Sequence, residues 1–248
     1  GRQGMDARHV VDLAALDQGV TSAHRRLAFE ELFLLQAAMV LRQREMKEEL
    51  KSFRFNPHVA QLKQLAKILP FTLTSAQERV FREIQADMVT SRPMNRLVQG
   101  DVGSGKTVVA LHALVMACGS GCQTALMVPT EILAEQHYLN LAPLLEAVGL
   151  KAVLLTSGGK AKDRNETLKQ LESGAAQVAI GTHALIQKKV RFANLGLVIV
   201  DEQHKFGVLQ RKTLLEKGYR PDVLVMTATP IQRTPARGAD GEGGGREV

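Results

Sequence analysis

The chain has 248 residues, of which 45% are hydrophobic, as is ordinary for a protein with a buried core. This length suffices for one large α/β domain with an appendage. No apolar run is long enough to span a bilayer, and the first residues show no signal-peptide pattern. We therefore expect a soluble, cytoplasmic chain without a membrane partner.

The formal net charge is +7, and the excess lies in residues 151–220, which hold 13 basic and 6 acidic residues. Such a concentration is typical of a surface that binds a polyanion. An ordinary solvated surface rich in lysine explains the charge equally well. Charge alone leaves both interpretations open.

The first predicted element is a long helix over residues 23–52. Apolar residues recur there at the spacings of three and four that mark one face of a helix. These residues include Ala28, Leu32, Leu35 and Met39. Asn56 and Pro57 interrupt the pattern, and a second helix, with Pro57 in its first turn, is expected to run to Ile68. Residues 1–68 are thus predicted to form a helical segment.

From residue 69 onward, short apolar segments alternate with helical ones, which predicts a mostly parallel sheet with helices on both faces. Strands are expected near 96–100, 123–128, 151–156, 177–181, 196–201 and 222–227. Helices are expected near 75–90, 106–118, 130–147, 163–173 and 208–217. Residues 235–248 contain 5 glycines and no apolar periodicity, so they are predicted to be a disordered tail.

A glycine-rich segment between a predicted strand and a predicted helix fits the pattern G-x-x-x-x-G-K-[ST] of a phosphate-binding P-loop. Its residues are Gly100, Asp101, Val102, Gly103, Ser104, Gly105, Lys106 and Thr107. Backbone N–H groups and the helix N-terminus would bind the phosphates, Lys106 would reach the β- and γ-phosphates, and Thr107 would ligate Mg²⁺. The alternative is a chance glycine-rich turn. The chain is therefore predicted to bind a nucleoside triphosphate.

Two carboxylates, Asp201 and Glu202, follow the apolar run 197–200 and would stand at the end of a buried strand. In a P-loop enzyme the first carboxylate helps to hold Mg²⁺, and the second is placed to orient or deprotonate the attacking water. A capping pair at a strand end is the alternative interpretation. The P-loop upstream favours the catalytic one.

The only two cysteines, Cys118 and Cys122, lie between the P-loop helix and the next strand. They could form half of a metal site, but no second Cys or His pair with suitable spacing accompanies them. Reduced structural thiols are the favoured interpretation.

The run 201–204, Asp-Glu-Gln-His, resembles motif II of the superfamily 2 helicases, and other motifs of that superfamily follow in the same order. The resemblance implies an adenine-binding Q motif, nucleic-acid backbone contacts in motifs Ia and Ib, a catalytic role for Gln203, and coupling residues. The Q-motif residues are Phe71 and Gln77, the backbone contacts are Pro129, Thr130, Gly181, Thr182 and His183, and the coupling residues are His204, Thr227 and Thr229. Without the resemblance, Thr74 and Gln77 would be interpreted as a helix start, and motifs Ia and Ib as ordinary turns.

The sequence resembles most closely the RecG family of bacterial ATP-dependent DNA helicases, which remodel stalled forks and branched DNA. The resemblance covers residues 23–234 and rests on the P-loop, on 130–137, 181–187 and 201–208, and on the run 25–32 in the first helix. The transcription-repair coupling factor is the alternative, with a weaker match at Ser104 and Gln203. Lys205 stands where the family usually has Arg, and Gln232 where it has Pro.

The resemblance implies that residues 69–234 form the first RecA-like lobe of a helicase motor that uses ATP and Mg²⁺, and that residues 1–68 are the family's helical connector. It also implies that the second lobe, with its transition-state arginines, and the DNA-binding wedge domain are missing. We expect a monomer that binds forked or branched DNA, binds ATP weakly, hydrolyses it slowly and unwinds nothing by itself. A non-catalytic remnant that binds ATP or DNA is the alternative.

Overall fold

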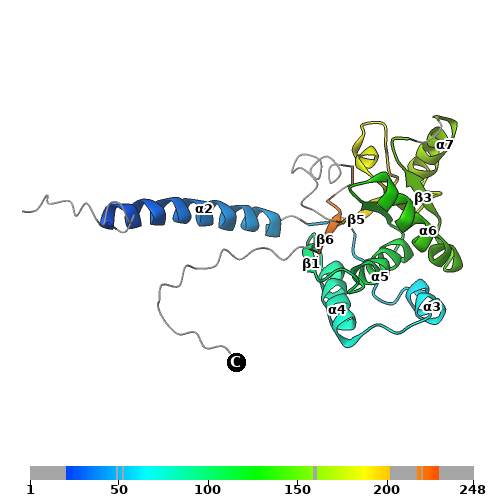
Figure 1. Ribbon diagram of the computed structural model, residues 1–248, viewed down its shortest axis with the longest axis horizontal. Coiled ribbons are helices and arrows are strands. Elements are labelled where there is room, and N and C mark those ends of the chain that lie inside the picture. Colours follow the sequence, from blue (N-terminus) through cyan, green and yellow to red (C-terminus); the bar gives the residue numbers. More distant parts are fainter. Residues whose placement is uncertain are drawn as a thin grey trace, which may run out of the picture. The chain divides into compact units, whose positions relative to one another are not determined.

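The computed structural model describes residues 21–48, 50–51, 53–158, 161–201, 217–218 and 220–228 (Figure 1). It divides the chain into two compact units, Gly1–Leu50 and Lys51–Val248. In the described residues the first unit consists of one long helix, and the second contains an α/β domain. The predicted helix at 208–217 lies almost wholly outside the described residues, and the predicted tail at 235–248 lies outside them entirely.

Helix α2 of the first unit spans Ser22–Glu48, which confirms the long helix predicted from the apolar spacing. Residues 50 and 51 are no longer helical, so the helix is shorter than predicted. Its large apolar side chains between Leu27 and Leu41 are exposed in this unit. The rings of Phe29 and Phe33 stack one turn apart, with their centroids 5.9 Å from each other.

Six strands form one parallel sheet in the order β1-β6-β5-β2-β4-β3. Their bounds are β1 Asn95–Gln99, β2 Gln123–Met127, β3 Ala152–Leu155, β4 Val178–Gly181, β5 Leu195–Asp201 and β6 Asp222–Thr227. All six lie where the short apolar segments predicted them. The described helices of this unit are α3 Ala60–Ile68, α4 Ser75–Val89, α5 Lys106–Gly119, α6 Glu131–Ala147, α7 Ala161–Glu172 and the 3₁₀ helix η2 His183–Ile186. The sequence did not predict η2.

Alternate residues of the strands enter two apolar clusters on opposite faces of the sheet. Leu126 and Ile199 pack with residues of α3, α4, α5 and α6 in the first cluster. Their neighbours Met127 and Val200 pack with residues of α7 and η2 in the second. Because both faces are covered, the central strands β2, β4, β5 and β6 are almost entirely buried, as the sequence analysis expected, whereas the edge strand β1 buries only Val98.

Helix α3 belongs to the sheet domain, although the sequence grouped it with the connector. Its Leu65 is fully buried in the first apolar cluster, and the helix contacts α5 and α6. The boundary between the two compact units accordingly lies at residue 51 and not at residue 69.

The prediction that Pro57 lies in the first turn of a helix is wrong. The Asn56 Oδ1 atom accepts a hydrogen bond from the His58 N–H at 2.9 Å, which closes an Asx turn around the proline. Val59 is extended, and α3 begins only at Ala60. The asparagine side chain thus favours a turn where the proline alone would permit a helix.

Candidate nucleotide-binding site

The P-loop connects the end of β1 at Gln99 to the start of α5 at Lys106. Gly103 and Gly105 have φ angles of 83° and 81°, in the left-handed region that glycine adopts without strain. A Cβ atom on Gly105 would also overlap the Gln77 side chain. The φ angle thus favours glycine at both positions, and the lack of space excludes a side chain at Gly105 as well.

Lys106 lies in the first turn of α5, and its ammonium group turns back onto the loop. Its Nζ atom donates hydrogen bonds to the carbonyl oxygens of Gly100 at 2.7 Å and Asp101 at 2.8 Å. The cation is therefore held inside the curve of the loop, beside the helix N-terminus, whose N–H groups are free of helical partners in any α-helix.

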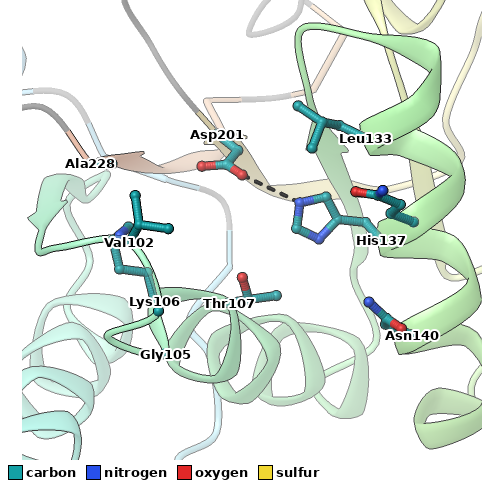
Figure 2. A pocket seen from close by; sticks show the side chains of 11 residues that line it. Val102, Gly105, Lys106, Thr107, Leu133, His137, Asn140, Asp201 and Ala228 are labelled. Carbon is teal, nitrogen blue, oxygen red and sulfur yellow. Dashed lines mark hydrogen bonds and ion pairs between the residues drawn. The ribbon is translucent and has the colours of Figure 1, made fainter.

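A pocket of about 340 Å³ opens between the P-loop and α6 (Figure 2). Lys106 and Thr107 border it from α5, Asp201 from the end of β5, and His137 and Asn140 from α6. The full lining consists of Val102, Gly103, Gly105, Lys106, Thr107, Leu133, Gln136, His137, Asn140, Asp201 and Ala228. The structure thus brings Asp201 together with Lys106 and Thr107, although Asp201 lies 94 residues after Thr107 in the sequence.

The sheet order explains why these groups meet. Asp201 pairs in register with Met226 of β6, and Gln99 of β1 pairs with Thr227. The Gly100 N–H also donates to the Thr227 carbonyl at 3.4 Å. The carboxyl ends of β1, β6 and β5 therefore lie side by side, which is where parallel sheets bind ligands.

The oxygen atoms that face the pocket suit a small, hard cation. Thr107 offers a hydroxyl and Asp201 a carboxylate, both of them ligand types that Mg²⁺ accepts, and Mg²⁺ usually keeps several waters and substrate phosphates as its other ligands. Within the described residues there is no cluster of three or more His, Cys, Asp or Glu side chains that could hold a metal by themselves. A site of few protein ligands fits Mg²⁺ better than a transition metal.

Gln77 connects α4 to the P-loop. The Thr74 hydroxyl accepts from the Gln77 N–H and the Gln77 Oε1 atom accepts from the Thr74 N–H, which forms a capping box. Its Nε2 atom donates to the Ser104 carbonyl at 2.9 Å. The helix-start interpretation is therefore confirmed. Neither Gln77 nor the half-exposed Phe71 lines the pocket, and their adenine-binding role stays a prediction.

The predicted nucleic-acid contacts lie at the ends of β2 and β4, which are neighbours in the sheet. Thr130 caps α6, where its hydroxyl accepts from the Leu133 N–H, and Thr182 caps η2, where its hydroxyl accepts from the Ala184 N–H. Pro129 precedes the first cap. Gly181 lies so close to the Leu155 carbonyl that a Cβ atom would overlap it.

Sequence reasoning missed a loop that lies beside these caps. The Ser157 N–H donates to Glu131 Oε1 at 2.8 Å, and the Ser157 hydroxyl lies 3.2 Å from Nε2 of the exposed His183. Hydrogen bonds thus connect the ends of β2, β3 and β4. The position of Ser157 directly after a predicted strand was the one available indication.

Sequence reasoning also missed the side chains of α6 that line the pocket, namely Leu133, Gln136, His137 and Asn140. Their spacing marks one face of a helix.

Of the other predicted residues, Glu202, Gln203, His204 and Thr229 lie outside the described residues. None of the described helices combines the length and the apolar composition that a bilayer crossing requires.

Comparison with known proteins agrees with this geometry. The sequence pattern of the DEAD/DEAH box helicase family matches residues 74–237. The chain is 52% identical over 214 residues to the ATP-dependent DNA helicase RecG of Synechocystis, and 53% identical over 220 residues to that of Bacillus subtilis. These alignments cover 86% and 89% of this chain but 26% and 32% of the two relatives. The chain thus spans a third or less of their length.

Solved structures also show similarity to helicases. A structure of RecG bound to a three-way DNA junction superposes with a TM-score of 0.74 at 45% identity, over 84% of this chain and 28% of that one. Yeast Dbp5 superposes with a TM-score of 0.52 at 17% identity, over 70% of this chain and 47% of that one, and supports the fold alone. The transcription-repair coupling factor is not favoured. The chain belongs to the DEAD/DEAH box helicase family, whose members use a nucleotide, and its sequence is of the RecG type.

Proposed function

We propose that this chain is the ATP-binding lobe of a DNA helicase that couples ATP hydrolysis to the remodelling of branched DNA. The observation that carries the proposal is the convergence of Lys106, Thr107 and Asp201 on one pocket. A P-loop, a hydroxyl and a strand-end carboxylate are the parts that phosphoryl transfer requires in P-loop enzymes. The helicase activity of the relatives belongs to proteins about three or more times as long, so it enters here as part of the proposal.

In this proposal the triphosphate lies along the P-loop. The loop N–H groups and the start of α5 bind its oxygens, and Lys106 exchanges the carbonyls of Gly100 and Asp101 for the phosphates. This exchange costs little, because Asp101 is exposed and Gly100 is only partly buried, so water can solvate the released carbonyls. Gln77 and Phe71 would contact the base from α4 and the segment before it.

Mg²⁺ would be held by the Thr107 hydroxyl and the Asp201 carboxylate, together with phosphate oxygens and waters. It would neutralise negative charge on the transferred phosphate. Glu202, which follows Asp201 directly, would orient or deprotonate the attacking water, with Gln203 beside it. His204, Thr227 and Thr229 would relay the nucleotide state to the DNA contacts.

DNA would lie across the ends of β2 and β4. Hydroxyls and N–H groups at helix starts are common phosphate contacts, and Thr130 and Thr182 each cap such a start. His183 and the exposed Lys188 and Lys189 adjoin them. A relative of 45% identity has been captured on a three-way junction, which supports branched DNA as the substrate class.

The nucleotide site is tested by calorimetric titration of the 248-residue chain with ATP and Mg²⁺. Lys106→Ala should lower the affinity tenfold or more, since a hydrogen bond to a charged group contributes about 1.5–3 kcal/mol. Lys63→Ala removes an exposed lysine from α3 and serves as the matched control, with unchanged affinity. Equal binding by the wild type and Lys106→Ala would refute the P-loop assignment.

A further inference from the structure

His137 makes a direct contact with the carboxylate proposed to hold Mg²⁺. Its Nε2 atom lies 3.3 Å from Asp201 Oδ2, and the two side chains are only 12% and 18% exposed. Figure 2 shows the imidazole ring reaching from α6 toward Asp201 at the edge of the pocket. Because an ionised carboxylate can only accept hydrogen bonds, the Nε2 atom of His137 carries the hydrogen of this bond.

The backbone that carries His137 is firmly placed. Helix α6 begins at the Thr130 cap, and its residues Ala134, Leu141 and Leu145 are buried against the sheet. Burial of that face fixes the rotation of the helix about its axis. The side of the helix next to that buried face therefore presents His137 to the pocket, with Asn140 three residues further along.

A carboxylate at a strand end can rotate about its side-chain bonds, and a metal ligand works best when an outer partner fixes its orientation. We propose that His137 is a positioning residue for Asp201: it holds the carboxylate in the orientation that receives Mg²⁺ together with Thr107. The inference rests on the proposed function, because it assigns a role relative to the ion that Asp201 would bind.

In this proposal His137 acts on the Asp201 carboxylate and does not bind the ion itself. Imidazole is a suitable ligand for zinc, copper and iron, whereas Mg²⁺ prefers oxygen. Loss of His137 should therefore raise the Mg²⁺ concentration that the site requires, although no ligand of the ion is removed. A residue that merely fills space would instead affect nucleotide binding with and without the ion.

The experiment compares three substitutions in the full chain. His137→Gln keeps an N–H donor with nearly the reach of Nε2, His137→Asn carries its donor too close to the backbone, and His137→Ala has none. Leu139→Ala, an exposed residue of the same helix outside the pocket lining, is the matched control. Binding of a fluorescent ATP analogue with a β,γ-imido bridge is measured against rising Mg²⁺, and again in excess EDTA.

We expect His137→Ala and His137→Asn to raise the Mg²⁺ concentration at half-saturation about tenfold, the lower end of the range for lost outer partners. His137→Gln should stay close to the wild type, as should Leu139→Ala. Affinity for the analogue in EDTA should be the same for all four variants and the wild type.

Three results would overturn the inference. They are an unchanged Mg²⁺ requirement in His137→Ala, an equal loss of affinity with and without Mg²⁺, or an equal shift in Leu139→Ala. Failure of the proposed function has a different outcome, since the wild type would then bind no analogue at any Mg²⁺ concentration or Lys106→Ala would bind it equally well.

Discussion

Cys118 and Cys122 lie in the core of the sheet domain, at the end of α5 and just before β2. Both are free thiols, 6% and 3% exposed. The Cys118 sulfur lies 3.6 Å from the Thr124 hydroxyl, and the Asn194 amide donates to the Cys122 sulfur at the same distance. Burial raises the pKa of Cys118 to about 12 and that of Cys122 to about 11. Both residues therefore stay protonated at neutral pH, as structural thiols do.

These raised pKa values predict slow thiol chemistry in the folded protein. The thiolate is the reactive form, so Ellman's reagent at pH 8 should label neither cysteine until guanidinium unfolds the chain. Because both pKa values lie well above 9, a rise from pH 8 to pH 9 should leave the native protein unlabelled. Lys63→Cys places a thiol on the exposed side of α3 and should react at once. Prompt labelling of two native thiols in the wild type would contradict the burial.

At the scale of elements, β6 connects a buried ion pair to the nucleotide pocket. At its start, the Lys51 ammonium donates to both carboxylate oxygens of Asp222, at 2.8 and 3.0 Å, and to the Met88 carbonyl, and both charged side chains are fully buried. Desolvation raises the pKa of Asp222 to about 6, against the opposing effects of Lys51 and the Met94 N–H. The carboxylate is thus ionised at pH 7.5. At its other end, β6 delivers Thr227 beside the P-loop.

Breaking this pair from one side should destabilise the domain strongly. Lys51→Met leaves a buried carboxylate without its cation, which typically costs about 3–5 kcal/mol. Adding Asp222→Asn should recover much of that loss, because the amide is neutral and its oxygen can still accept from the Met94 N–H. Urea unfolding at pH 7.5 measures both variants. Additive losses in the double variant would show that the two side chains do not act as a pair.

Sequence and structure agree where one local pattern decides an element. The four central strands were predictable because each apolar run is short and both of its faces are buried, and the P-loop was predictable because its glycines satisfy a backbone requirement. Pro57 was misassigned because the Asn56 side chain competes for the backbone. His137 was missed because its role depends on Asp201, 64 residues later in the chain. The sequence of α6 alone gives no sign of that contact.

At the scale of the whole domain, the strand order separates two proposed sites along one edge of the sheet. The ends of β1, β6 and β5 carry the P-loop, Thr227 and Asp201, whereas the ends of β2, β4 and β3 carry the caps and Ser157. Helix α6 adjoins both groups, since Thr130 begins it and His137 follows two turns later, about 10 Å along the axis. One rigid helix therefore spans the distance between the proposed DNA and nucleotide sites.

The position of the basic residues predicts where DNA lies on this edge. Lys188, Lys189 and Arg191 follow η2 closely and are exposed, and Arg191 makes a long ion pair with Glu172, at 3.7 Å. Reversal of all three to glutamate should weaken binding to a three-way junction. It should also lower the slope of log affinity against log salt by about 2–3, given roughly 0.9 per phosphate contact.

The matched control changes the same number of charges elsewhere in the domain. Lys63, Lys67 and Arg79 are exposed on α3 and α4, away from the strand ends that carry the caps. Their reversal to glutamate lowers the net charge equally, so any loss that depends on net charge alone should appear in both triple variants. A salt slope reduced only by the first reversal would locate the phosphate contacts beside η2. Equal slopes in the two variants would mean that the DNA contacts lie elsewhere, and that the cluster in residues 151–220 is an ordinary solvated surface.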